Sequence, residues 1–418
     1  MKNNAFAKNT AFQYVLQAAK YLFPFITIPY LTRVLGPDIY AVRAYILAAM
    51  TFMQVFLDYG FNSYGIRAVA KAVDDPGKIR VEMSAIMASR LCLCVVGAVV
   101  LVPITMCIPI MAQYPAYVAI AYVCVCFKAT LPDFIFTGLE DMGIITYRFV
   151  VAQAVSTVLI IVLVHGPEDL LLVPAFEALA AFIAFVWSWE NVLVKRAIKP
   201  VKITLAKLKA VFSESTVFFL SNAATTIFTC LTTLMIGIFI QDPAEISYWS
   251  LAMTAVQAIQ SLYTPITNSL YPHMCKRQDF ALFKKLMIAG MIAVTIGSIA
   301  FAMLSEVVML VLGGEEYLAG SYVIAMVTPV IFFSYPAMLV GFPVLAAVGQ
   351  TKQLTASSVI SALFHIAGLF VLAAGGWFTL VNVVVLRCCT EGVLLLMRTL
   401  FVVLWAKGRD KYSEGSGF

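Results

Sequence analysis

Twelve long apolar runs, separated by short polar turns, constrain this chain more than any other feature. Each run is about 20 residues or longer, the length that an α-helix needs to cross a hydrocarbon core about 30 Å thick. Glycine, proline and acidic residues divide the runs, as at Gly36-Pro37-Asp38. The runs lie near residues 11–32, 44–64, 84–112, 116–137, 144–164, 170–190, 214–240, 246–270, 287–312, 320–348, 355–376 and 380–405. The sequence therefore predicts an all-α polytopic membrane protein with twelve transmembrane helices.

The composition excludes several other classes of protein. Only 12% of the residues are charged, about half the share that is usual in soluble domains, and no polar stretch is long enough for a separate soluble domain. The nine cysteines lie mostly within apolar runs and predict no disulfide framework. We find no phosphate-binding glycine loop and no metal-ligand spacing in the sequence. We therefore expect neither an enzyme, nor a nucleic-acid-binding protein, nor a bound metal or cofactor.

The distribution of basic residues predicts the topology. If the N-terminus is cytoplasmic, 21 of the 28 lysines and arginines fall in cytoplasmic segments, and two, Arg33 and Arg43, fall in outer loops. This asymmetry is the one that the positive-inside rule requires. It predicts that both termini are cytoplasmic.

A basic polar stretch near mid-chain, Asn191 to Ser213, divides the twelve runs into two sets of six. We interpret residues 1–195 as an N-terminal six-helix lobe, 196–213 as a cytoplasmic linker and 214–418 as a C-terminal six-helix lobe. The linker could contain an amphipathic helix on the anionic inner leaflet, or it could be a topogenic loop alone.

A weak internal repeat agrees with this division. A shift of 206 residues superposes Asn62-Ser63 on Asn268-Ser269, and it also aligns Gln54 with Gln260. An even number of helices in each half gives the halves the same orientation, an architecture that transporters use with a substrate site between the repeats. The alternative is a chance alignment of small and polar residues.

Four segments resemble a known family. The stretch from Pro24 to Pro37, PFITIPYLTRVLGP, is similar to the opening helix of bacterial polysaccharide-biosynthesis flippases, the Wzx-type O-antigen exporters of the multidrug/oligosaccharidyl-lipid/polysaccharide (MOP) superfamily. The segments 58–62, 137–140 and 218–222 resemble the same family. The resemblance covers residues 9–275, and the last four helices agree by topology alone. Ala41 and Ser247 depart from it, since glycine is expected at both positions.

The resemblance implies two pseudo-symmetric six-helix lobes of the MOP type, also found in multidrug and toxin extrusion (MATE) transporters. It implies a flippase that translocates undecaprenyl-diphosphate-linked oligosaccharide repeat units, of O-antigen or another surface polysaccharide, across the bacterial inner membrane by alternating access. The lipid-linked oligosaccharide and membrane lipid would be its ligands. A polysaccharide polymerase and a chain-length regulator would be its protein partners.

Polar and cationic side chains within the apolar runs suggest where such a substrate would bind. A charge at mid-bilayer costs at least about 2.5–3.5 kcal/mol, so each one needs a reason. Lys20 shares a helical strip with two glutamines, which indicates a water-filled interior. A cationic cavity suits a diphosphate. The candidate substrate-binding residues are Gln13, Gln17, Lys20, Arg33, Asn62, Arg90, Lys128, Ser221, Asn222 and Asn268.

Structural interpretations of these charges remain open. Lys20 could form an ion pair with a neighbouring helix, Lys128 could pair with Asp133, and Arg90 could snorkel to the inner surface. Three acidic residues are candidates for coupling to a proton or sodium gradient, or could neutralise cavity cations instead: Asp58, Glu177 and Glu306.

Two further polar features of the last helices have structural interpretations. We expect Arg387 and Glu391, spaced i, i+4, to form a structural salt bridge. We expect His365 to be a hydrogen-bonded interior residue.

Two other functions make different predictions. A cation-coupled multidrug exporter of the same superfamily predicts an acidic, aromatic-lined cavity. A membrane glycan polymerase or ligase predicts a large periplasmic loop with catalytic arginine or histidine residues, and the sequence has no such loop.

Overall fold

The computed structural model describes the backbone of residues 2–240 and 242–414. Side-chain surroundings are described there except at residues 2–10, 217, 220–222, 224–229, 268–269, 272–273, 275–277 and 407–414. In this described part every regular element is a helix and no strand forms, which confirms the all-α prediction. The helices fall into two compact units, Met1–Thr226 and Ile227–Phe418.

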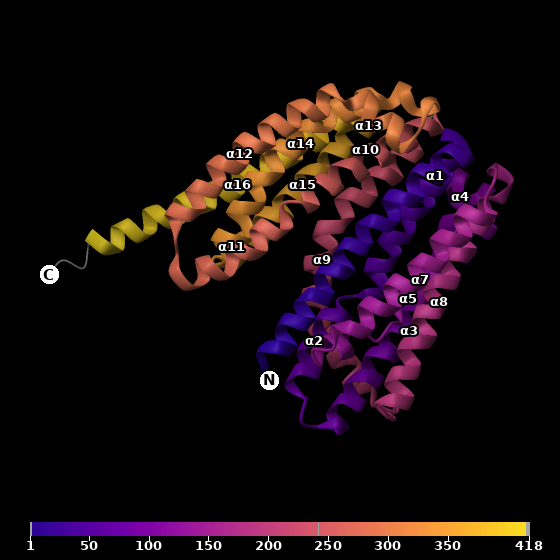
Figure 1. Ribbon diagram of the computed structural model, residues 1–418, viewed down its shortest axis with the longest axis vertical. Helices are drawn as coiled ribbons and strands as arrows, with labels where there is room; N and C mark the ends of the chain where they lie inside the picture. The colour runs from indigo at the N-terminus through magenta and orange to yellow at the C-terminus, as the bar shows by residue number, and fades with distance from the viewer. Residues whose placement is uncertain (1, 241, 415–418) are drawn as a thin grey trace. The chain divides into compact units, whose positions relative to one another are not determined.

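The first unit contains the helices coloured indigo to magenta in Figure 1. They are α1 (Lys2–Asp58), α2 (Phe61–Lys71), α3 (Pro76–Cys107), α4 (Pro109–Gln113), α5 (Pro115–Ala129), α6 (Asp133–Gly138), α7 (Met142–Leu163), the 3-10 turn η1 (Pro167–Leu171), α8 (Leu172–Glu190) and the π-helical turn η2 (Asn191–Lys195). The long helix α9 (Leu205–Phe239) begins in this unit and ends in the second.

The second unit continues with α10 (Pro243–Ser261), α11 (Thr264–Arg277), α12 (Phe280–Met303), α13 (Ser305–Leu312), η3 (Glu315–Gly320), α14 (Ser321–Leu339), η4 (Val340–Ala346), α15 (Thr351–Ala374) and α16 (Leu380–Glu414). At its centre, α14 packs against α10, α12, α13 and α16. Figure 1 shows α12, α14 and α16 running side by side.

The helices approximately match the twelve predicted spans. Among the described residues, nine stretches are long and apolar enough to cross a membrane. One of these, Ala11–Lys71, contains the first two predicted spans, and α9 and α10 lie at the seventh and eighth. The protein is therefore a multi-pass membrane protein with the predicted helix order.

The first two spans are joined by a very short break inside α1. Gly36 has φ 71° and ψ 170°, a conformation essentially restricted to glycine. Pro37 follows, where its fixed φ suits the first position of a new helix. The outer loop predicted here is thus little more than a turn, and Arg43 lies within a helix, not in a loop.

A second break, at the end of α1, brings two sequence motifs together. Gly60 has φ 72°, and a Cβ added to it would lie 2.7 Å from Phe218 Cβ and from backbone atoms of α9. Beside this contact, Tyr59 stacks on Phe219 with ring centroids 4.6 Å apart. The segments 58–62 and 218–222, which resemble the same family separately, therefore meet at this close helix contact.

Small side chains allow two helices of the first unit to approach closely. Ala152 of α7 packs with Ala180 and Ala184 of α8, and all three are buried. In hydrocarbon, small residues at a helix interface let backbones gain van der Waals contact that lipid cannot replace. This contact fixes α7 beside α8, where the polar residues described below lie.

We predict that Gly60→Ala destabilises the protein by at least about 2 kcal/mol, because the left-handed conformation costs an L-residue about 1–2 kcal/mol and the added methyl group also meets Phe218. Gly297→Ala is the matched control, since a Cβ at Gly297 meets nothing within 4 Å. Unfolding of the detergent-purified variants measures both effects. Equal stability of the two variants would contradict the role assigned to Gly60.

Candidate functional site

The fourth span is interrupted within the membrane. Helix α5 ends at Ala129 and α6 begins at Asp133, so Thr130, Leu131 and Pro132 lie between two helical segments. A break of this kind frees backbone carbonyls, which lipid cannot hydrogen-bond. Arg90 donates to Leu131 O at 2.8 Å, and the indole of Trp189 donates to Thr130 O at 3.2 Å. Two side chains, one from α3 and one from α8, thus supply hydrogen-bond donors to the carbonyl groups at the break.

Arg90 also pairs with an acid at the end of α1. Its guanidinium donates to Asp58 Oδ1 at 2.9 Å and lies over the ring of Phe134, 5.5 Å from the centroid. Arg90 is only 2% exposed, so it does not snorkel to the inner surface. Such a buried pair holds α1, α3 and the break in α5–α6 in one arrangement.

A second ion pair begins at Asp133, the first residue of α6. The guanidinium of Arg148, in α7, donates to Asp133 and to the hydroxyl of Ser188 in α8. Arg148 is buried within α7. The interpretation that Asp133 neutralises Lys128 is therefore wrong, because Asp133 pairs with Arg148.

A third cluster combines two cations with one carboxylate. Arg43 is buried and donates to Glu177 Oε1 of α8 at 3.2 Å. Lys128, near the end of α5, interacts electrostatically with the same Glu177 and with Cys124. Its side chain is exposed, in contrast to Arg43. Because one carboxylate faces two cations, this cluster has a formal charge of +1.

The predicted polar strip on α1 lies on the exposed side of that helix. Gln13, Gln17 and Lys20 are all exposed, and the described residues include no ion-pair partner for Lys20. Arg33, also exposed, donates to Pro29 O of its own helix at 2.6 Å. The opposite side of α1 packs on α7, where Thr146 donates to Phe12 O at 3.0 Å. The strip is therefore free of neighbouring helices within its own unit.

The other predicted site residues are dispersed. Asn62 is half-buried, and its Oδ1 is buried without a hydrogen-bond partner in the described structure. Glu306 is exposed in the first turn of α13. The side chains of Ser221, Asn222 and Asn268 lie outside the described residues. The roles of these residues stay predictions.

The second unit contains the two structural features expected from the sequence. Arg387 donates to Glu391 Oε2 at 2.7 Å, which confirms the predicted salt bridge. His365 is fully buried, with Thr232 2.7 Å from Nε2 and Thr390 2.7 Å from Nδ1. Because the Thr390 hydroxyl donates to Leu386 O, Nδ1 must be the donor to Thr390. His365 is thus a hydrogen-bonded interior residue, as expected from the sequence.

The main residues missed by sequence reasoning are Arg43, Asp133, Arg148 and Trp189. One signal was available, since Pro132 inside the apolar run 116–137, followed directly by Asp133, marks a helix break. The residues that bind at this break come from helices distant in sequence, and no pattern in the sequence near the break predicts them.

Known proteins share this fold. The backbone is similar to that of an inward-facing multidrug-resistance MATE transporter of the MOP superfamily, with a TM-score of 0.74 at 12% identity, covering 92% of this chain and 95% of that one. At this low identity the similarity shows the fold alone, which is the MOP fold predicted from the sequence. The class is therefore a polytopic membrane protein with a transporter fold.

Sequence comparison shows the family. Residues 6–278 match the polysaccharide biosynthesis protein family, and the chain belongs to that family. A relative from Escherichia coli (strain K12), named "Putative O-antigen transporter", is 25% identical over 267 residues, which are 64% of this chain and 64% of the relative; this match thus spans less than two thirds of that relative. A relative of the same name from Shigella dysenteriae is 24% identical over 90% of this chain and 96% of its own length.

We predict that Arg90→Met destabilises the protein by about 3 kcal/mol, because it leaves Asp58 without its partner and the Leu131 carbonyl without its donor. The double variant Arg90→Met/Asp58→Leu should recover part of this loss, since no unpaired carboxylate remains. Arg33→Met is the matched control and should change stability by less than about 0.5 kcal/mol. Additive effects of the two single substitutions in an unfolding cycle would refute the coupling between Arg90 and Asp58.

Proposed function

We propose that this protein is a flippase that moves an undecaprenyl-diphosphate-linked oligosaccharide repeat unit, of O-antigen or another surface polysaccharide, from the inner to the outer leaflet of the bacterial inner membrane. The arrangement that carries the proposal is that of two cations, Arg43 and Lys128, that share the single carboxylate of Glu177. Family membership and the names of the two relatives support the same substrate class.

The chemistry of such a substrate fits a cation that shares its carboxylate with a second cation. In a low-dielectric interior, two cations beside one carboxylate repel each other more strongly than they would in water. A diphosphate next to Lys128 neutralises the excess charge and accepts charge-assisted hydrogen bonds from the ammonium group. A cationic drug would add to the repulsion. This cluster therefore favours an anionic lipid over the cationic substrate of a multidrug exporter.

The proposed binding set extends along α1. Lys20 and Arg33 would contact the diphosphate or acidic sugars, and Gln13 and Gln17 would hydrogen-bond neutral sugars. Asn62, Ser221, Asn222 and Asn268 would supply further amide and hydroxyl groups to the glycan. The lipid tail would remain in the bilayer, because it gains nothing from a polar cavity.

Arg90 has a positioning role in this proposal. Its two terminal nitrogens bind Asp58 and Leu131 O, and its Nε has no hydrogen-bond partner in the described structure. In this proposal Arg90 therefore holds the helix break beside Lys128. Lys128 lies two residues before the break.

The proposed transport cycle is alternating access by two six-helix lobes on either side of a linker at residues 196–213. Asp58, Glu177 and Glu306 are the proposed coupling residues for a proton or sodium gradient. Among them Glu177 would respond most directly to the substrate, since it shares its charge with Lys128. In this proposal both termini are cytoplasmic, the protein makes and breaks no covalent bond, and a polymerase with its chain-length regulator uses the exported unit.

We predict that Lys128→Ala lowers polysaccharide export about tenfold or more, because a charged hydrogen bond contributes about 1.5–3 kcal/mol. Lys128→Arg should retain most activity, and Lys199→Ala, an exposed lysine outside the cluster, is the charge-matched control. Surface polysaccharide and lipid-linked oligosaccharide retained in the inner leaflet are measured in the native host, with protein levels checked. Normal export combined with lost drug resistance in Lys128→Ala would favour a multidrug exporter instead.

Lys20→Ala should abolish export while the protein still inserts in the membrane. The reason is that Lys20, an exposed cation on a polar strip, has no ion-pair partner in the described structure and so stabilises no helix packing. Membrane-fraction protein and surface polysaccharide are compared with those of the wild type. Full export by this variant would exclude Lys20 from the binding set.

A further inference from the structure

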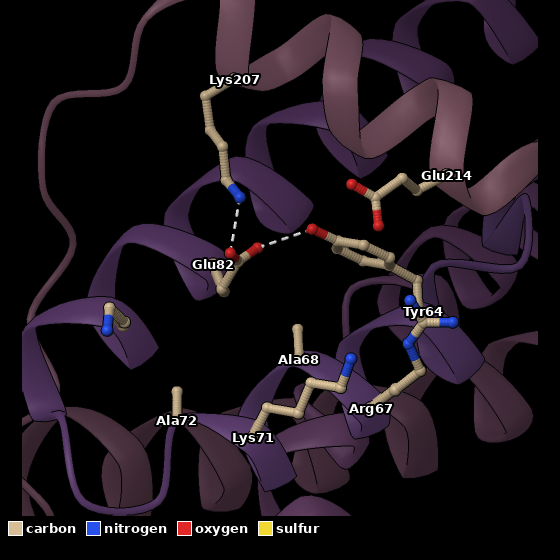
Figure 2. A pocket seen from close by; sticks show the side chains of 9 residues that line it. Tyr64, Arg67, Ala68, Lys71, Ala72, Glu82, Lys207 and Glu214 are labelled. Carbon is tan, nitrogen blue, oxygen red and sulfur yellow. Dashed lines mark hydrogen bonds and ion pairs between the residues drawn. The ribbon is translucent and has the colours of Figure 1, made fainter.

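A cavity of about 350 Å³ lies at the basic end of the first unit, away from the ion-pair clusters described above. Its walls come from α2, the start of α3 and the first turns of α9 (Figure 2). All of its lining residues belong to one compact unit. The lining contains four basic and two acidic side chains, so the cavity has a net positive charge.

One of the two carboxylates is fully engaged. Lys207 Nζ lies 2.5 Å from Glu82 Oε1, and the hydroxyl of Tyr64 donates to Glu82 Oε2 at 2.9 Å. Figure 2 shows these three side chains meeting on one side of the cavity. Glu82 therefore neutralises Lys207, and no ion pair joins it to the other cations of the lining within the described structure.

Two of the remaining cations are uncompensated. Arg67 and Lys71 are four residues apart on α2, so they lie on one face of that helix, and both are exposed. Like charges at this spacing destabilise a helix. No ion pair or hydrogen bond engages either side chain within the described structure, and Glu214, the second carboxylate of the lining, pairs with neither. Lys78 is held outside this pair by Asp75, 3.3 Å away.

Apolar side chains are exposed next to the lining residues. Val73 follows α2, Val81 precedes Glu82 on α3, and Leu205 begins α9; all three are exposed, Leu205 to 67%. Exposed apolar groups beside lysine and arginine are typical of the membrane interface, where lipid headgroups meet acyl chains. The predicted topology makes this the cytoplasmic interface, whose leaflet is anionic.

We propose that this cavity binds the phosphate of a membrane lipid, held by Arg67 and Lys71 opposite the Lys207–Glu82–Tyr64 group. The guanidinium of Arg67 offers a planar pair of donors to phosphate oxygens, and Lys71 adds a point charge. The acyl or prenyl chain would leave the cavity along the exposed apolar side chains. The site does not depend on which molecule the protein transports, since none of its residues belongs to the proposed transport site.

The test is calorimetric titration of the full-length protein in a non-ionic detergent. The four probes are eight-carbon-chain phosphatidylglycerol, phosphatidylcholine with the same chains, farnesyl diphosphate and inorganic phosphate. We expect phosphatidylglycerol or farnesyl diphosphate to bind, with the stronger of the two identifying the lipid source. In Arg67→Gln/Lys71→Gln that affinity should fall about tenfold or more, and added salt should weaken binding to the wild type.

The matched control is Lys199→Gln/Lys202→Gln, which removes the same charge from exposed positions outside the cavity. It should bind as the wild type does. Thermal unfolding without ligand verifies that both double variants are folded. Three results would overturn the proposal: no lipid binding, equal losses in the two double variants, or inorganic phosphate binding as tightly as the lipids.

Discussion

The arrangement of the first unit depends on one requirement, that backbone carbonyls freed inside a membrane must find donors. The break at residues 130–132 frees such groups in the last third of a span. Arg90 and Trp189 supply the donors, and Arg148 holds the first residue of the following segment through Asp133. The hydrogen bonds and the ion pair at this three-residue break therefore hold helices α3, α7 and α8 in position.

Arginine and lysine have different tasks in this unit. Arg43, Arg90 and Arg148 are buried, and each guanidinium forms an ion pair with one carboxylate. A planar group with five donors suits such fixed pairing. Lysines 20 and 128 remain exposed, and a flexible ammonium group can follow a moving anion. In the proposed transport cycle, this separation lets the arginines hold the helices while the lysines bind and release the substrate.

Local patterns in the sequence predicted the helices and the short-range pairs. The apolar runs predicted the membrane spans. The i, i+4 spacing predicted the Arg387–Glu391 salt bridge, and the apolar residues around His365 predicted that it lies in the interior. The partners of Arg43 and Asp133 could not be predicted, because periodicity within one helix contains no information on which distant helix faces it. The Gly36 turn caused the main error, since its single-residue break moved Arg43 from a loop into the core.

The distance along the chain between ion-pair partners has a consequence for biogenesis. Arg43 enters the membrane early, but Glu177 follows 134 residues later, which at 5–20 residues per second is a delay of roughly 7 to 27 s. During that time the guanidinium needs water, lipid phosphate or the insertion machinery as a temporary partner. The Arg43–Glu177 pair can therefore form only after α8 has been synthesised.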